Sequence, residues 1–245
     1  MTAISVKDLG VSLAGMPILK EVSFTIEDTE TVALLGANGS GKSTLIRTIL
    51  GFYPRHLGEV EILGTPIASF TSWDQIGYVP QKASISLHST TVAEVVASGV
   101  LANRSLGWFT RQNRRQVSEA LGIVDLEEFA GEPFLHLSGG QQQRVLIARG
   151  IVNHPRLIIM DEPFAGVDAA NQRAIAATLA TLTSTVLVVL HETGAFTDLI
   201  DRTLVLHQGR LLRGHRGPPE PHTGHETQRM DHYPRLTSLE PGWTS

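Results

Sequence analysis

The chain has 245 residues, a formal net charge of −4 at pH 7 and no cysteine. The absence of cysteine excludes disulfides, zinc–cysteine sites and thiol catalysis, and the acidic balance does not indicate nucleic acid as a partner. No apolar run approaches the ~18 residues that a membrane span needs, and Met1–Asp8 lacks the apolar segment of a signal peptide. We therefore expect any membrane role to depend on a partner chain.

The N-terminal part of the chain predicts strands around one glycine-rich loop. Apolar alternation predicts strands at Ile4–Leu13 and Ile18–Ile26. The apolar run Thr31–Leu35 predicts a buried strand, and Leu45–Leu50 predicts a helix. Between them stands Gly36–Thr44, which matches the phosphate-binding pattern G-x-x-x-x-G-K-[ST]. The motif therefore has the strand–loop–helix context that it requires.

The chemistry of this phosphate loop follows from its residue types. Glycines let the backbone curl so that consecutive N–H groups point at one anion, and the helix N-terminus adds partial positive charge. We expect Lys42 to reach the β- and γ-phosphates of a nucleotide and the Ser43 hydroxyl to bind Mg²⁺. The alternative is a glycine-rich turn that binds nothing. The predicted nucleotide-binding residues are Gly36, Ala37, Asn38, Gly39, Ser40, Gly41, Lys42, Ser43 and Thr44.

Helical signals follow in the middle of the chain. Gln75–Gln81 predicts a short strand that Pro80 ends, which leaves Gln81 on a loop. Residues 82–137 then lose the strand pattern, and we interpret them as a helical insertion between two α/β parts. Its predicted helical segments are the capping-box stretch Thr91–Glu94 with the valine stripe behind it, Gln112–Leu121 and Asp125–Phe129.

The α/β pattern returns after the insertion. Leu157–Met160 and Thr185–Leu190 are continuous apolar runs, which are typical of strands covered on both faces of a parallel sheet. Alanine-rich stretches predict helices over Gln141–Val152 and Ala169–Leu182, and a closing hairpin is predicted around His207–Gly209. The second half of the chain therefore repeats the strand–helix alternation of an α/β protein.

Three further segments carry predicted chemistry. Asp161 follows a buried strand, where an acid can hold Mg²⁺ beside the phosphate loop, and the Glu162 carboxylate can orient or deprotonate an attacking water. The alternative for each is a structural acid at a strand end. Leu137–Gln141 reads Leu-Ser-Gly-Gly-Gln and opens a helix, so it builds a second anion-binding helix N-terminus. One chain does not need two anion-binding sites for one phosphate group. We therefore expect the second site to bind a nucleotide held by another chain.

Together these segments resemble the ATP-binding cassette (ABC) family of transporter ATPases over about Ile4–Leu212. The matching motifs are Gly36–Thr44 for Walker A, Leu157–Asp161 with Glu162 for Walker B and the catalytic glutamate, Leu137–Gln141 for the signature, Gln81 for the Q-loop, Ala165–Asp168 for the D-loop and His191 for the switch histidine. The resemblance implies an α/β fold. It would have a P-loop NTPase core with a mixed or parallel sheet, an N-terminal antiparallel β subdomain and the helical insertion subdomain.

The resemblance also implies ATP and Mg²⁺ as cofactors and a role for each motif. Glu162, His191 and Gln81 would be catalytic, with His191 contacting the γ-phosphate. Ser43, Gln81 and Asp161 would form the metal site. The residues implied to bind ATP held by a partner cassette, or to lie along the dimer interface, are Ser138, Gly139, Gly140, Gln141 and Asp168. Leu13 stands where many relatives have an adenine-stacking aromatic residue, so apolar contact with the base is expected instead.

The implied partners are a second ATPase subunit, most simply a second copy of this chain, and polytopic membrane permease subunits. An extracytoplasmic metal-binding protein would act through the permease. The expected location is peripheral, on the cytoplasmic face of the plasma membrane, without nucleic acid. Phe164–Val167 and Gln75–Lys82 resemble the zinc/manganese branch of the family. The predicted function is therefore an ATPase that energises divalent-metal import, with iron–siderophore, haem or cobalamin import as the alternatives.

Two other functional classes are less consistent with the sequence. Soluble cassettes that act on ribosomes or DNA usually carry two cassettes or long coiled coils, and this chain has neither pattern. A phosphate-loop kinase or GTPase has no use for Leu137–Gln141. Co-purification with a polytopic membrane protein, rather than with ribosomes, would distinguish these classes.

Residues 1–213 are predicted to form the ATPase domain, and 214–245 to form a mostly disordered tail. The tail holds five of the 12 prolines and four of the 10 histidines. Imidazole binds zinc well, but the spacing of His215, His222, His225 and His232 fits no tight tetrahedral site. A polar tail that binds no metal is the favoured interpretation.

Overall fold

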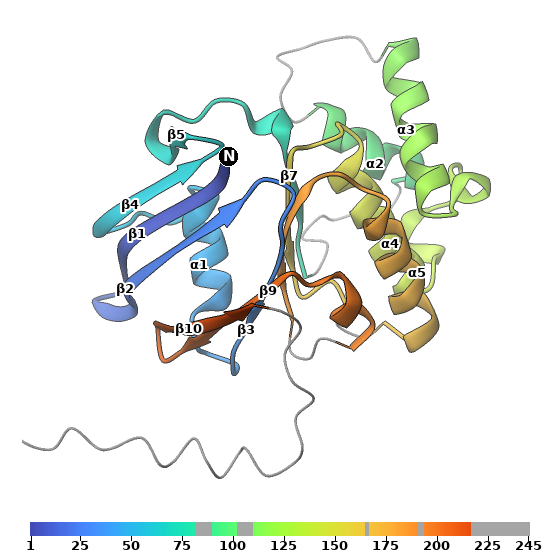
Figure 1. Ribbon diagram of the computed structural model, residues 1–245. Coiled ribbons are helices and arrows are strands. Elements are labelled where there is room, and N and C mark those ends of the chain that lie inside the picture. Colours follow the sequence, from blue (N-terminus) through green and yellow to red (C-terminus); the bar gives the residue numbers. More distant parts are fainter. Residues whose placement is uncertain (82–89, 102–109, 165–166, 191–193, 217–245) are drawn as a thin grey trace, which may run out of the picture.

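The computed structural model describes residues 1–81, 90–101, 110–164, 167–190 and 194–216. Two sheets pack around one helix, and the remaining helices lie on the far side of the larger sheet (Figure 1). Within the described ranges, no helix combines the length and the hydropathy needed to cross a bilayer.

The first sheet is antiparallel and has the strand order β2-β1-β4-β5. Its strands are β1 (Thr2–Leu13), β2 (Met16–Glu27), β4 (Leu57–Ile62) and β5 (Thr65–Pro66). Buried and exposed residues alternate along the second half of β2, as expected for a sheet with one face on a core. The predicted N-terminal antiparallel β subdomain is therefore present.

The second sheet is mixed and has the order β10-β9-β3-β8-β7-β6. Its strands are β3 (Thr31–Leu35), β6 (Ile76–Val79), β7 (Leu157–Asp161), β8 (Thr185–Val189), β9 (Arg202–His207) and β10 (Arg210–Arg216). All neighbouring pairs are parallel except β9 and β10. Every residue of β7 and β8 is buried, which confirms the α/β fold class predicted from their continuous apolar runs.

The helices divide between the two faces of the second sheet. Helix α1 (Lys42–Ile49) lies between the two sheets. On the other face lie α2 (Val92–Leu101), α3 (Arg111–Ile123), α4 (Gly139–Ile151) and α5 (Ala169–Ala180) (Figure 1). Short 3₁₀ turns occur at Ile67–Ser69, Trp73–Gln75, Glu127–Phe129, Phe134–His136 and Gly194–Leu199.

One predicted helix is shorter than the sequence suggested. The segment Asp125–Phe129 forms only a 3₁₀ turn over Glu127–Phe129. Asp125 has φ +55°, in the left-handed region, so the chain turns sharply there and cannot continue a right-handed helix.

Two hydrophobic cores share the second sheet because its strand residues point alternately to its two faces. On β7, Leu157 and Ile159 belong to the core around α1 and the first sheet. Ile158 and Met160 belong to the core beneath α2–α5. The carboxyl ends of β3, β6, β7 and β8 are therefore held between two packed layers, where α/β proteins bind ligands.

Helix α4 approaches strand β6 as closely as two backbones allow. A Cβ atom added at Gly77 would lie 2.3 Å from the Gly150 carbonyl oxygen. Gly150 faces the same contact, since its Cβ would lie 2.9 Å from Val79 Cγ2. Glycine at both positions is thus a packing requirement, which local sequence patterns do not reveal.

Strand β10 continues past the predicted domain end at residue 213. After an irregularity, His215 pairs with Thr203 and Arg216 with Arg202, so the edge strand runs to Arg216. The other tail histidines, at 222, 225 and 232, lie outside the described residues, as does the rest of the predicted tail from residue 217.

Candidate nucleotide-binding site

The phosphate loop runs from the end of β3 to the start of α1, and three of its glycines have positive φ. The values are +153° at Gly36, +78° at Gly39 and +106° at Gly41. Gly36 also touches the last hairpin, because a Cβ there would lie 2.3 Å from the Leu206 carbonyl oxygen. A side chain at Gly36 is therefore excluded by both conformation and space.

Two buried polar groups in the loop fit an anionic ligand. The Lys42 ammonium donates to the carbonyl oxygens of Gly36, at 2.7 Å, and Ala37, at 3.2 Å. The Ser40 hydroxyl is buried and has no hydrogen-bond partner within the described residues. Buried polar groups usually have partners, so a phosphate would supply the acceptor that the Ser40 hydroxyl lacks, and the positive charge of Lys42 suits the same anion. Ala37 and Asn38 lie at the exposed turn of the loop, and Thr44 lies in α1.

Two of the three predicted metal ligands, Ser43 and Asp161, meet where β7 ends. Ser43 Oγ donates to Asp161 Oδ1 at 3.4 Å, and the Asp161 side chain is buried. Burial raises the pKa of the Asp161 carboxyl above its usual value, and Glu162 adds to that rise, whereas the Ser43 hydroxyl opposes it. In the described part of the chain, no group of three or more His, Asp or Glu side chains could hold a metal ion. Two oxygen ligands beside a phosphate loop suit Mg²⁺, which usually keeps several waters.

Glu162 and Gln81 are in direct contact. Gln81 Nε2 donates to Glu162 Oε2 at 2.5 Å, which brings together two predicted catalytic residues from the ends of β6 and β7. Glu162 has φ +50° and precedes Pro163, an uncommon backbone geometry for a side-chain-bearing residue. Its N–H donates to the Val189 carbonyl oxygen at 3.2 Å, so the end of β8 holds this conformation. The third predicted catalytic residue, His191, lies outside the described residues.

The second anion site is the N-terminus of α4. Ser138 and Gln141 form a reciprocal capping box: Ser138 Oγ accepts from the Gln141 N–H at 3.3 Å, and Gln141 Oε1 accepts from the Ser138 N–H at 2.9 Å. The N–H groups of Gly139 and Gly140 belong to the first helical turn and have no acceptor within the helix. Gly139 is exposed with open space around it, so an anion can approach from that side.

Asp168 caps the N-terminus of α5. Its carboxylate accepts from the Ala170 and Asn171 N–H groups, both at 3.0 Å, and from Asn171 Nδ2 at 2.6 Å. These bonds, led by the Asn171 N–H, hold the pKa of the Asp168 carboxyl below its usual value. Asn171 was not a predicted site residue, although its position three residues after a capping aspartate is a recognisable local signal.

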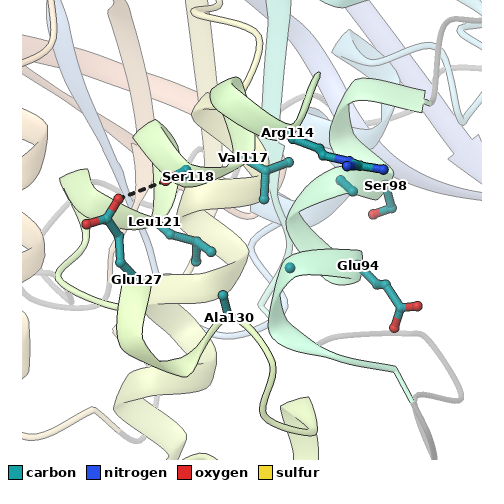
Figure 2. A pocket seen from close by; sticks show the side chains of 10 residues that line it. Glu94, Ser98, Arg114, Val117, Ser118, Leu121, Glu127 and Ala130 are labelled. Carbon is teal, nitrogen blue, oxygen red and sulfur yellow. Dashed lines mark hydrogen bonds between the residues drawn. The ribbon is translucent and has the colours of Figure 1, made fainter. Parts of the chain in front are cut away.

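An apolar groove of about 450 Å³ lies between α2 and α3, away from the phosphate loop (Figure 2). Ala97, Val117, Leu121 and Ala130 contribute to its apolar lining. Charged side chains also border it: Arg114 of α3, Glu94 of α2 and Glu127, which accepts a hydrogen bond from Ser118 Oγ at 2.9 Å. Figure 2 shows the Glu94 carboxylate pointing away from the apolar side chains.

Leu13 lies at the end of the β1–β2 hairpin, opposite Met16. The same hairpin passes beside the phosphate loop, because a Cβ at Gly41 would lie 2.9 Å from Leu19 Cδ2. Leu13 is partly buried and Met16 is mostly exposed. The described hairpin thus offers apolar side chains near the loop, and the predicted contact with adenine stays a prediction.

Comparisons with known proteins agree with this geometry. The family model described as "ABC transporter" matches residues 19–165. The chain is similar to the zinc transport system ATP-binding protein TroB of Treponema pallidum (strain Nichols), with 39% identity over 86% of this chain and 81% of the relative. It is also similar to the manganese transport system ATP-binding protein MntB of Bacillus subtilis (strain 168), with 37% identity over 87% of each chain.

Solved structures give the same result for the fold. A nucleotide-free ATP-binding cassette from an ABC transporter superposes with a TM-score of 0.81 at 25% identity, covering 89% of this chain and 92% of that one. A bacterial ABC transporter cassette solved as a dimer superposes with a TM-score of 0.77 at 28% identity, covering 87% of this chain and 98% of that one.

Proposed function

This chain belongs to the ABC transporter family, and we propose that it energises an importer for a divalent metal, zinc or manganese. As a family member it is a cassette that binds and hydrolyses ATP. The observation that carries the cargo proposal is the similarity to ATP-binding proteins of zinc and manganese transport systems, which extends over most of both chains. The metal would be the transported substrate and would not bind to this subunit.

In this proposal the phosphate loop holds the nucleotide. Its N–H groups and the N-terminus of α1 surround the phosphates. Lys42, now bonded to two carbonyl oxygens of the loop, would turn to the β- and γ-phosphates. The buried Ser40 hydroxyl would gain an acceptor that it lacks among the described residues.

Ser43 and Asp161 are the proposed ligands of Mg²⁺, which would neutralise charge on the β- and γ-phosphate oxygens. Glu162 would orient the attacking water and accept its proton. Gln81, already bonded to the Glu162 carboxylate, would hold that carboxylate in place and reach the metal or the water. These roles rest on side chains that lie together at the ends of β6 and β7.

We propose that two copies of the chain complete each other's sites. Within the described residues of one chain, no hydrogen bond joins the N-terminus of α4 to the phosphate loop. The N–H groups of the first turn of α4 have no acceptor within the helix, and Gly139 leaves them exposed on one side, so they are available for the γ-phosphate of ATP on a second copy. The similar cassette solved as a dimer supports this arrangement.

The groove between α2 and α3 is the proposed docking surface for a membrane permease subunit (Figure 2). An apolar floor bordered by Arg114, Glu94 and Glu127 suits a short amphipathic helix with charges at its edges. Docking there would hold the subunit at the cytoplasmic face of the membrane. A metal-binding protein outside the membrane would then reach this chain only through the permease.

Metal uptake by whole cells tests the proposed function. Cells that carry Glu162→Gln instead of the native residue should lose zinc or manganese accumulation, measured by mass spectrometry, because the energy-supplying step is blocked. Arg115→Ala is the matched control, since it breaks only an exposed pair with Glu119. Unchanged accumulation of both metals in the Glu162→Gln cells would refute a role in metal import.

A further inference from the structure

The two glycines that open α4 differ in their surroundings. Nothing lies within 4 Å of a Cβ added at Gly139. A Cβ at Gly140 would lie 2.8 Å from both Cγ and Nδ2 of Asn171. Gly140 is buried and its φ is not positive, so the close approach of the Asn171 side chain, and not backbone conformation, disfavours a larger residue there. Gly139 leaves the anion site open, whereas Gly140 packs the helix against α5.

The same Asn171 side chain holds the carboxylate that caps α5. Asn171 Nδ2 donates to Asp168 Oδ2 at 2.6 Å, while the Asn171 N–H donates to Asp168 Oδ1 at 3.0 Å. One amide group therefore lies against the first turn of α4 and also bonds Asp168, the capping residue of α5. The backbone N–H and the Nδ2 group of Asn171 bond the two oxygens of one carboxylate, and together these bonds fix the orientation of the amide.

We propose that Asn171 is a positioning residue that holds the second anion site and the Asp168 cap of α5 in one fixed arrangement. This inference rests on the proposed function, in which both segments face a second copy of the chain. Asn171 itself touches no nucleotide. It acts through Gly140 and Asp168, so the two segments can meet the partner's phosphate loop together.

The proposal predicts separate effects on ATP binding and on dimerisation. In a Glu162→Gln background, Asn171→Ala should weaken ATP-dependent dimerisation about tenfold, because one bond to a charged group is lost. Dimerisation would be measured by analytical ultracentrifugation with MgATP. Binding of a fluorescent ATP analogue at concentrations where the chain is monomeric should not change, because the phosphate loop is intact.

The matched control is Asn153→Ala in the same background. Asn153 Nδ2 donates to the Gly99 carbonyl oxygen at 2.8 Å, so the control removes an asparagine bond of the same kind away from both segments. It should lower thermal stability without weakening dimerisation. Equal weakening of dimerisation by the two variants would refute the positioning role. Unchanged dimerisation in Asn171→Ala would refute it as well.

A double-mutant cycle tests the packing contact independently. Gly140→Ala should lower the thermal midpoint, and adding Asn171→Ala should recover part of the loss because Cγ and Nδ2 are gone. Additive losses would contradict the contact. If the parent Glu162→Gln protein does not dimerise with MgATP, the proposed function fails. If the parent dimerises with MgATP and the Asn171→Ala variant dimerises equally well, the proposed function stands and only this inference fails.

Discussion

At the scale of single residues, Asp161 shows a conflict between stability and function. Its carboxyl is buried at the end of β7, and burial raises its pKa because the charged form is poorly solvated there. The Ser43 hydroxyl donates a hydrogen bond to Asp161 Oδ1 at 3.4 Å. The side chain is suited to a bound cation. Without one, this buried carboxyl lowers the stability of the folded protein.

We therefore predict that Asp161→Asn raises the thermal midpoint of the nucleotide-free protein. Asparagine keeps the shape and the acceptor for Ser43 while removing an ionisable group from a buried position. Mg²⁺-dependent ATP hydrolysis should fall on the order of 10²-fold. Calorimetry and a phosphate-release assay would measure the two effects. Asp198→Asn, at an exposed position, is the control with the same charge change, and a similar midpoint for both variants would contradict the prediction.

Residue types and spacing predicted much of the site, because phosphate and Mg²⁺ chemistry allow few alternatives. Ser43 of the phosphate loop and Asp161 lie together, as a shared Mg²⁺ site would require. The direct bond between Gln81 and Glu162 was not predictable, since it depends on how β6 and β7 pair. Asn171 was missed for a similar reason. Its contact with Gly140 is a meeting of two helices that no local pattern encodes.

At the scale of secondary-structure elements, the packing of α4 on β6 depends on glycine. We predict that Gly77→Ala lowers the free energy of unfolding by about 1–3 kcal/mol, because the added methyl would lie 2.3 Å from the Gly150 carbonyl oxygen. The thermal midpoint should fall by roughly 2–4 °C for each kcal/mol.

Gly131→Ala is the matched control for that prediction, because nothing lies within 4 Å of its added Cβ and its φ is not positive. Its effect should stay within about 0.5 kcal/mol. Chemical denaturation with a circular-dichroism readout would compare the two. Equal stability of both variants would show that the backbones of α4 and β6 can separate at little cost.

Periodicity predicted the elements well and their ends less well. The continuous apolar runs form β3, β7 and β8, because a strand that is apolar on both faces is stable only where both faces are covered. Of the 3₁₀ turns, only Glu127–Phe129 fell within a predicted helical segment, since such turns are too short for a periodic signal. The order of strands in the second sheet was also beyond reach, because it depends on pairings between distant parts of the sequence.

At the scale of the whole molecule, the proposed docking groove lies apart from the phosphate loop, since no residue of the loop lines it. We predict that Ala130→Phe reduces recovery of the permease with this subunit at least about tenfold, since a bulky ring would fill the groove. ATP hydrolysis by the isolated subunit should be preserved, because the phosphate loop is elsewhere. Affinity purification from solubilised membranes would measure recovery.

Ala177→Phe provides the control, because Ala177 is exposed on α5 and does not line the groove. It should leave recovery of the permease unchanged. Recovery of the permease with Ala130→Phe at the level of the unmodified chain would show that the membrane subunit docks on another surface. A loss of ATP hydrolysis in Ala130→Phe would show instead that the ring disturbs the fold.

The phosphate loop is supported by strands that come much later in the sequence, which affects when the loop can fold during synthesis. Strand β3 pairs with β8 and β9, Gly36 rests on the Leu206 carbonyl, and the Gly209 N–H donates to the Ser40 carbonyl oxygen at 3.0 Å. The ribosome therefore releases the loop long before its supports exist. Such long-range pairing slows folding. We therefore expect a growing chain to gain its affinity for ATP only after the β9–β10 hairpin has emerged.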